Sequence, residues 1–187
     1  MQSKGDVEQL LMDSFKELVL EIPVEKITIK EITDKAGVIR PTFYNHFQDK
    51  YEVIERIISK DIITPMEALL QNDLIPEAYT LLFSNLQKDG EYYKRLSKME
   101  GQNSLQDITR RCIKDGLLRY IEKRVHLEVG SNRLLTPDHF ADYYAQSICF
   151  VIFTWIQEDM GATPREMSDL CEYMMSHSML EAIKDME

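Results

Sequence analysis

Apolar residues recur at spacings of three and four along most of the chain. In the first such segment they are Val7, Leu10, Leu11, Phe15, Leu18, Val19 and Ile22. This period is typical of an amphipathic helix that packs one face on a core, and the following Pro23 ends it. No segment shows the strict alternation of a half-buried strand. The pattern predicts an all-α fold of about nine helices.

Residues 27–50, ITIKEITDKAGVIRPTFYNHFQDK, predict two short helices joined by a tight turn. Thr28 suits an N-cap, and Glu31 three residues later completes a capping box. Gly37 follows the last periodic residue, where a left-handed backbone conformation favours glycine. The second helix is expected over residues 40–47, with a proline in its first turn. A helix–turn–helix of this size places its second helix in the major groove of DNA.

Further helices are expected throughout the rest of the chain. One runs from about Lys50 to Ile63, where Pro65 stops or kinks it. Later N-terminal signals of helices stand at Pro76, Ser104, Thr136-Pro137 and Thr163-Pro164. A loop is expected over residues 127–135.

The last two predicted helices, residues 137–159 and 164–184, are unusually apolar. The first is apolar nearly all round, and the second carries a broad stripe rich in methionine. We expect a homodimer in which both helices pair with their copies as a four-helix bundle. The expected interface residues are Phe150, Phe153, Met167, Cys171, Met174 and Ser178. The alternative is that both stripes belong to the core of one protomer.

The net charge of the chain bears on whether it binds DNA. With 32 acidic and 22 basic residues, the net charge is −10, although phosphate contacts dominate the affinity of DNA-binding proteins. Only the local arrangement of charges favours DNA binding, because residues 26–50 contain five Lys or Arg residues and three acidic residues. The acidic surface also suits a protein-interaction or adaptor module, which is the alternative function.

The cysteines and the longest apolar run indicate where the protein resides. Cys112, Cys149 and Cys171 lie far apart without metal-ligand spacing, which favours buried free thiols in a reducing cytoplasm. The apolar run over 148–153 is much shorter than the roughly 20 residues that span a bilayer. The N-terminus lacks the apolar core of a secretion signal. We expect a soluble, cytoplasmic protein that does not bind membranes.

Residues with catalytic or metal-binding chemistry do not form a convincing set. No nucleophile elbow, glycine-rich phosphate loop or paired-carboxylate motif is present, so neither enzymatic activity nor a cofactor is expected. Asp138, His139 and Asp142 could approach a metal, but acids in a first helical turn more simply complement the helix dipole. His177 stands among methionines and is interpreted as a packing residue. No metal site is predicted.

The segment GVIRPTFYNHFQDK resembles the G-V-x-x-x-T-F-Y-x-H-F-x-x-K pattern of TetR/AcrR-family transcriptional regulators. The residues in register are Gly37, Val38, Thr42, Phe43, Tyr44, His46, Phe47 and Lys50. The resemblance covers about residues 8–60. Ile39 departs from the pattern, because the family often has a serine there as N-cap. The later segment DGEYYKRL is similar to a Gram-positive subgroup that includes regulators of dihydroxyacetone kinase.

The resemblance implies DNA contacts that agree with the chemistry of the residues. Arg40 can donate two hydrogen bonds to a guanine edge, and hydroxyl groups suit phosphate oxygens. A helix N-terminus at Thr28 favours a phosphate. The predicted DNA-binding residues are Thr28, Lys30, Arg40, Pro41, Thr42, Tyr44, Asn45, His46 and Lys50.

The resemblance also implies a body that binds a small-molecule effector. Candidate pocket residues are Met66, Tyr79, Phe83, Tyr92, Tyr93, Leu117, Tyr120, Tyr144 and Trp155, for which ordinary helix packing is the alternative. Residues 1–50 would form the DNA-binding domain, and residues 51–187 would form the effector-binding and dimerisation domain. The expected function is that of a homodimeric, ligand-responsive repressor at a pseudo-palindromic double-stranded DNA operator. The effector would shift the helix that begins at Lys50 and thereby change the separation of the two DNA-binding domains.

Overall fold

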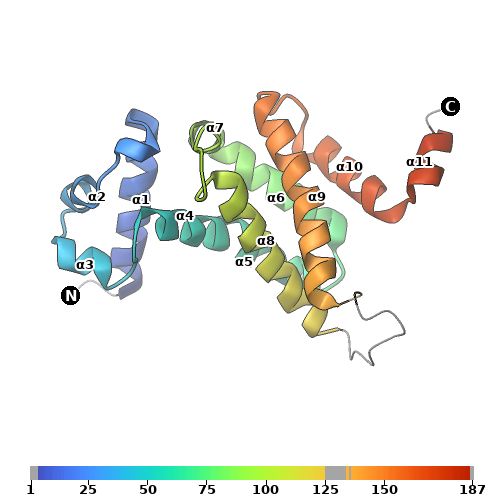
Figure 1. The fold of residues 1–187 in the computed structure, drawn as a ribbon, viewed down its shortest axis with the longest axis horizontal. Helices are drawn as coiled ribbons and strands as arrows, with labels where there is room; N and C mark the ends of the chain where they lie inside the picture. Colours follow the sequence, from blue (N-terminus) through green and yellow to red (C-terminus); the bar gives the residue numbers. More distant parts are fainter. Residues whose placement is uncertain (1–3, 125–133, 135, 186–187) are drawn as a thin grey trace.

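The computed structural model describes residues 4–124, 134 and 136–185, and all regular elements within them are helical (Figure 1). This confirms the predicted all-α class. The elements are α1 (Lys4–Glu21), η1 (Val24–Lys26), α2 (Ile29–Ala36), α3 (Arg40–Tyr44), α4 (Lys50–Ile58), η2 (Ser59–Ile63), α5 (Thr64–Gln71), α6 (Ile75–Lys88), α7 (Gly90–Leu96), α8 (Leu105–Glu122), α9 (Pro137–Gln157), α10 (Pro164–Ser176) and α11 (Met179–Asp185). η1 is a 3-10 helix and η2 is a π-helical segment.

Helices α1, α2 and α3 form a small unit at one end of the molecule, which we call the head (Figure 1). Phe43 and Phe47 are fully buried with their ring centroids 5.6 Å apart, and they pack in one core with Phe15 of α1. The capping box of α2 is formed by Thr28 and Glu31 as predicted. Gly37 ends α2 at φ +67°, a conformation that a side chain would strain.

Helix α4 leaves the head and continues through η2 into α5, so the head and the remaining helices, the body, share one bent rod (Figure 1). The π-helical turn has a local cause. Pro65 has no N–H, so it cannot donate to the carbonyl oxygen of Asp61 four residues earlier. The side-chain amide of Asn85 on α6 donates to that oxygen instead, at 2.8 Å. Pro65, predicted to stop or kink the helix, does not stop it: the chain widens into a π-helical turn and continues as α5.

The body packs α8 against α9 and α6 against α10. At its centre the rings of Phe83 and Trp155 meet edge to face with their centroids 5.2 Å apart. The indole N–H of Trp155 donates to the carbonyl oxygen of Ala162 at 2.9 Å, so the buried ring has a polar partner. The helix starts predicted at Ser104, Thr136 and Thr163 are confirmed, since each side chain accepts a backbone N–H of the first turn.

The prediction of one continuous helix over 164–184 is wrong. The chain is extended at His177, and Ser178 begins a separate helix, α11. The Ser178 N–H donates to Glu181, and the Glu181 N–H donates back to Ser178, which is a capping box based on serine. The sequence Ser178-x-x-Glu181 carries this signal, which the continuous methionine stripe obscured.

The three cysteines are free thiols within the helices. Burial raises the pKa of the Cys112 and Cys149 thiols to about 12 and that of Cys171 to about 11. The loop predicted over 127–135 lies outside the described residues except for Leu134. Within the described part of the chain, no helix has the length and apolar character of a membrane span.

Candidate nucleic-acid interface

Helix α3 turns its outer face to solvent at the end of the head farthest from the body (Figure 1). Arg40, Pro41, Tyr44 and Asn45 are exposed there, and Thr42 is half-buried. Ile39 precedes them with 70% of its surface exposed and no side-chain cap hydrogen bond. A short, protruding helix that carries a guanidinium, an amide and hydroxyl groups can read base edges and phosphates.

Arg40 and Tyr44 are coupled across one turn of α3. The guanidinium donates to the Tyr44 hydroxyl oxygen from Nη2 at 2.9 Å and from Nε at 3.3 Å. Its carbon Cζ also lies 5.5 Å from the centroid of the tyrosine ring. The tyrosine thus holds the guanidinium along the exposed face of α3.

The sequence predicts His46 on the outer face of α3, but its side chain is buried in the head. Only 6% of its side chain is exposed, and its Nδ1 lies 3.8 Å from a carboxylate oxygen of Glu8 on α1. Because α3 ends at Tyr44, the next residues turn back toward the head core, where His46 packs beside Phe47. In this structure the imidazole is a packing residue of the head and does not face a phosphate.

Lys50 is directed into the head as well. Its ammonium donates to the carbonyl oxygens of Val24 at 2.7 Å, Ile27 at 3.0 Å and Glu25 at 3.1 Å. An ammonium has three N–H donors, so these acceptors use all of them. Burial lowers the pKa of Lys50, although Glu25 and Asp49 oppose this effect. The side chain therefore fastens η1 to α4 and does not reach for a phosphate.

The residues predicted at the start of α2 are engaged with their own helix. The Thr28 hydroxyl donates to a Glu31 carboxylate oxygen at 2.8 Å and accepts the Glu31 N–H at 3.2 Å. Lys30 lies 2.5 Å from Asp34, but both side chains are well exposed. An exposed pair of this kind contributes little free energy, so Asp34 holds the Lys30 side chain only weakly.

Two family models match the chain. The model described as "Bacterial regulatory proteins, tetR family" matches residues 12–57 and therefore includes the helix–turn–helix. The model described as "Transcriptional regulator C-terminal region" matches residues 73–177, which is more than half of the chain. The chain belongs to the TetR family. Members of this family are DNA-binding regulators and not enzymes.

Solved structures of TetR-family proteins share the fold at low sequence identity. The dihydroxyacetone kinase operon activator DhaS is 20% identical with a TM-score of 0.58 over 90% of this chain and 93% of that one. A TetR-family regulator from Syntrophomonas wolfei is 18% identical with a TM-score of 0.62 over 90% and 92%. NalD, the secondary repressor of MexAB-OprM in Pseudomonas aeruginosa, is 18% identical with a TM-score of 0.55 over 91% and 94%. No curated protein matches the chain in sequence.

The body of this TetR-family chain contains a small cleft beside η2 and α5. Of the predicted effector residues, Met66, Tyr79 and Leu117 line it, and its volume is about 50 Å³. Gly116 of α8 allows the close packing here, because a Cβ added to it would lie 3.0 Å from Ile63 of η2. The cleft is almost entirely apolar, with Glu67 at its edge.

The other predicted effector residues do not line this cleft. Phe83 and Trp155 belong to the body core, and Tyr120 lies under the guanidinium of Arg124 in a different surface groove. The remaining three are Tyr92, Tyr93 and Tyr144, which pack against other aromatic rings. Burial raises the pKa of Tyr92 and Tyr93, whose hydroxyls have no hydrogen-bond partner among the described residues. Of the nine candidates, only Met66, Tyr79 and Leu117 therefore share the cleft.

The acids considered as metal ligands are bound to cations instead. Asp138 pairs with Lys114 at 2.8 Å, and Asp142 pairs with Arg110 at 2.8 Å. Both pairs join α9 to α8. His139 contacts the carbonyl oxygen of Leu134 through Nδ1 at 2.8 Å. Within the described ranges, no group of three potential ligands is placed to hold a metal ion.

The residues predicted for a dimer interface divide into two sets. Phe153, Met167 and Cys171 are buried inside the protomer, so they are core residues and cannot offer surface to a partner. Phe150, which is 69% exposed, and Met174 and Ser178 lie at the surface. The helix periodicity identified the apolar stripes correctly, but it could not show which side of each stripe faces α6 and α8.

Proposed function

We propose that this TetR-family regulator is a homodimeric repressor that releases its operator when a small apolar molecule binds in the body. The single observation that carries the DNA-binding part is the outward face of α3, where Arg40 and Tyr44 stand exposed and coupled. Arg40 would contact a guanine edge, and Tyr44, Thr42 and Lys30 would contact phosphates. Asn45 and Pro41 would meet neighbouring bases. His46 and Lys50 would support the head from within.

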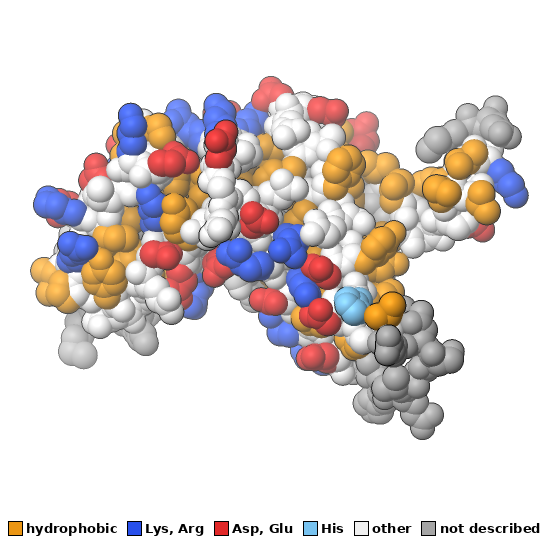
Figure 2. All heavy atoms as spheres, viewed as in Figure 1, with side chains coloured by type: hydrophobic (Ala, Val, Ile, Leu, Met, Phe, Trp, Pro, Cys, Tyr) orange, Lys and Arg blue, Asp and Glu red, His pale blue; other side chains and the backbone are white. Residues whose placement is uncertain are grey.

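The dimer is supported by the apolar surface of the last three helices. Figure 2 shows hydrophobic side chains gathered at this end of the molecule. The exposed ones are Phe140, Tyr143, Phe150, Leu170, Met174, Met175, Met179, Leu180 and Ile183. A patch of this kind on a soluble protein marks an interface, and a second copy related by two-fold symmetry would cover it. The two heads would then bind two half-sites of a pseudo-palindrome.

Ligand response is supported by the position of the body cleft. Met66 of α5 and Ile63 of η2 line it, and η2 continues directly from α4, which leads to the head. A cleft of about 50 Å³ holds no organic molecule, so an effector must push α5 away from α8. That movement would pass along the α4 rod and change the separation of the heads. The apolar lining favours an apolar effector.

The sign of regulation and the location are also part of this proposal. Among the similar structures, NalD is named a repressor and DhaS an activator. Repression is proposed because two heads on an operator occlude a promoter without further contacts. A cytoplasmic location follows from contact with DNA.

The experiment is a binding titration with DNA from the intergenic region upstream of the coding sequence, performed over a series of salt concentrations. We expect sequence-specific binding. The logarithm of its binding constant should fall linearly with the logarithm of the salt concentration. The variant Arg40→Ala should lose about 5- to 150-fold in affinity, corresponding to about 1–3 kcal/mol for a bidentate base contact. Arg165→Ala is the matched control, because Arg165 is an exposed arginine of α10 that pairs only with Asp169 among the described residues.

The second candidate is an adaptor module that acts through a protein partner, which the net charge of −10 favours. It predicts no specific DNA binding at low salt and an unchanged regulatory phenotype for Arg40→Ala combined with Tyr44→Ala. A reporter gene behind the upstream region separates the two candidates. Derepression by the double variant supports the operator-binding repressor, and an intact phenotype supports the adaptor.

A further inference from the structure

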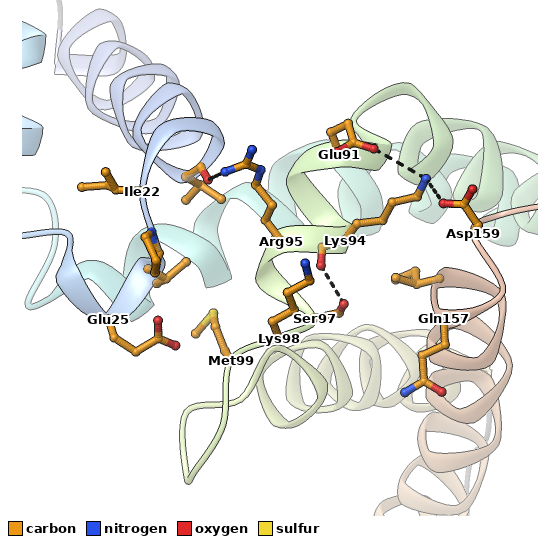
Figure 3. Close-up of a pocket in the computed structure, with 14 residues that line it drawn as sticks. Ile22, Glu25, Glu91, Lys94, Arg95, Ser97, Lys98, Met99, Gln157 and Asp159 are labelled. Carbon is orange, nitrogen blue, oxygen red and sulfur yellow. Dashed lines mark hydrogen bonds and ion pairs between the residues drawn. The ribbon is translucent and has the colours of Figure 1, made fainter.

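A larger cavity than the body cleft lies between the head and the body. It is a groove of about 800 Å³, a volume within the range of small-molecule sites. Val19 of α1, Ile22 just after that helix and Val24 of η1 form its head wall, and α7 with the following turn forms the opposite wall. Figure 3 shows side chains from both walls and from the end of α9 around this space.

Cations from one wall reach into the groove. Lys94 is already neutralised, since it lies 2.5 Å from Asp159 and 3.6 Å from Glu91, and the hydrogen bond to Asp159 raises its pKa (Figure 3). Arg95 and Lys98 form no ion pair with any residue in the described part of the chain. Arg95 makes one long hydrogen bond, 3.5 Å, to the carbonyl oxygen of Val19. The groove therefore contains two positive charges that lack a negative partner.

The floor of the groove is apolar. Met99, which follows the two cations along the chain, and Ile156 of α9 both line the groove and are buried. Glu25 lies at the head edge, to the left of Met99 in Figure 3, and no ion pair joins it to either free cation. A molecule that fits this lining carries one anionic group for Arg95 and Lys98 and an apolar part for the floor.

We propose that the groove is a binding site for a small amphipathic anion, such as a carboxylate with an aliphatic tail, distinct from the body cleft. The site has a position that couples it to the head. Val24 and Glu25 of η1 are held by the Lys50 ammonium and stand just before α2. A ligand that touches η1 and Lys98 together fixes the placement of the head on α7. An effect of the bound anion on operator binding rests on the proposed function, whereas binding of the anion to the groove does not.

The test uses two probes with the same tail, octanoate and 1-octanol, titrated into the full-length protein while amide NMR shifts are followed. Octanoate is expected to shift the amides of Glu25, Lys98 and Gln157 in a saturable manner, and octanol is expected to bind there much more weakly. Lys98→Gln should weaken octanoate about tenfold, the usual effect of losing one charge-assisted contact. Lys98 is exposed and its side chain makes no hydrogen bond or ion pair among the described residues, so the variant should keep the native fold.

Lys88→Gln is the matched control, since Lys88 is an exposed lysine of α6 outside this groove, and it should bind octanoate as the unmodified protein does. Shifts confined to Met66, Tyr79 and Leu117 would place the anion in the body cleft and overturn the proposal. Equal binding of octanoate and octanol, or no effect of Lys98→Gln, would do so too. A titration of the operator with and without octanoate then measures how ligand binding changes operator affinity. If the ligand-free protein does not bind the operator, that result counts against the proposed function only.

Discussion

The ammonium nitrogen of Lys16 lies 2.6 Å from a carboxylate oxygen of Asp61, which joins the first helix of the head to the π-helical turn. The same ammonium lies 2.7 Å from Asp89, where α6 meets α7. It also lies 5.7 Å from the centroid of the Tyr92 ring. A single head residue therefore contacts two separate segments of the body, and its charge is balanced by both.

Replacing Lys16 with methionine should destabilise the protein by about 1–3 kcal/mol, because two half-buried carboxylates lose their hydrogen-bonded cation. Denaturant unfolding followed by circular dichroism measures this change. Lys88→Met is the control, since Lys88 is exposed and has no ion pair among the described residues. Equal stability of the Lys16 variant and the control would mean that the two contacts contribute nothing.

Lys16 should also make the free energy of unfolding depend on pH. Burial lowers the pKa of Lys16, but the hydrogen bonds to Asp61 and Asp89 more than offset this, so the pKa is raised above 10.5. A raised lysine pKa stabilises the folded state fully below the unfolded pKa, and this contribution is lost as the pH rises through the folded pKa. The difference in unfolding free energy between the unmodified protein and Lys16→Met should therefore be constant near neutral pH and shrink above 10.5. Paired denaturant titrations across this range provide the check, and a difference that shrinks below pH 10.5 would contradict it.

Replacing Asn85 with leucine should leave the carbonyl oxygen of Asp61 without its donor. An orphaned, partly buried acceptor costs about 1–3 kcal/mol, measurable by denaturant unfolding. Pro65→Ala restores a backbone N–H four residues after Asp61, so the double variant should regain part of the loss. If Asn85→Leu and its double variant are equally unstable, the hydrogen bond is not what compensates for the proline.

Replacing Lys50 with methionine should destabilise the head by about 1–3 kcal/mol, because the carbonyl oxygens of Val24, Glu25 and Ile27 lose a charged donor. Lys30→Met is the comparison, since Lys30 is a well-exposed lysine whose removal should change stability by less than about 0.5 kcal/mol. Thermal unfolding gives the first readout. Operator affinity gives the second readout. Relative to its small effect on stability, Lys30→Met should weaken operator binding more than Lys50→Met does.

Charged substitutions in α9 should separate assembly from folding. Phe150→Asp places a carboxylate on a side chain that is 69% exposed, so the protomer should fold and the dimer should dissociate. Phe153→Asp buries a carboxylate at a position that is 8% exposed, so the protomer itself should unfold. Light scattering and circular dichroism together distinguish these results. A folded, dimeric Phe150→Asp protein would show that the partner lies elsewhere.

The features that were predictable from sequence are local ones. Thr28 with Glu31, Gly37, and Thr163 before Pro164 act through neighbours three or four residues away, so their geometry follows from the sequence itself. The outward position of Arg40 follows in the same way, because Phe43 and Phe47 fix which side of the segment is buried.

The features that were missed depend on residues far apart in the chain. Lys50 finds its acceptors about 25 residues earlier, and His46 is drawn toward Glu8 of another helix. The groove with Arg95 and Lys98 exists only because α7 lies beside α1. Such partners come from tertiary packing, which the periodicity of apolar residues predicts in outline but not residue by residue.

The π-helical turn between Ser59 and Ile63 also affects how this chain can change its length. An α-helix advances about 100° per residue, so one inserted residue would rotate all later side chains by that angle. A π turn takes up one residue without passing this rotation on. The side chains of α5 therefore point in the directions that they would have if α4 and α5 formed one continuous α-helix with one residue fewer. A homologue without that residue could keep both the head-facing and the cleft-facing surfaces in register.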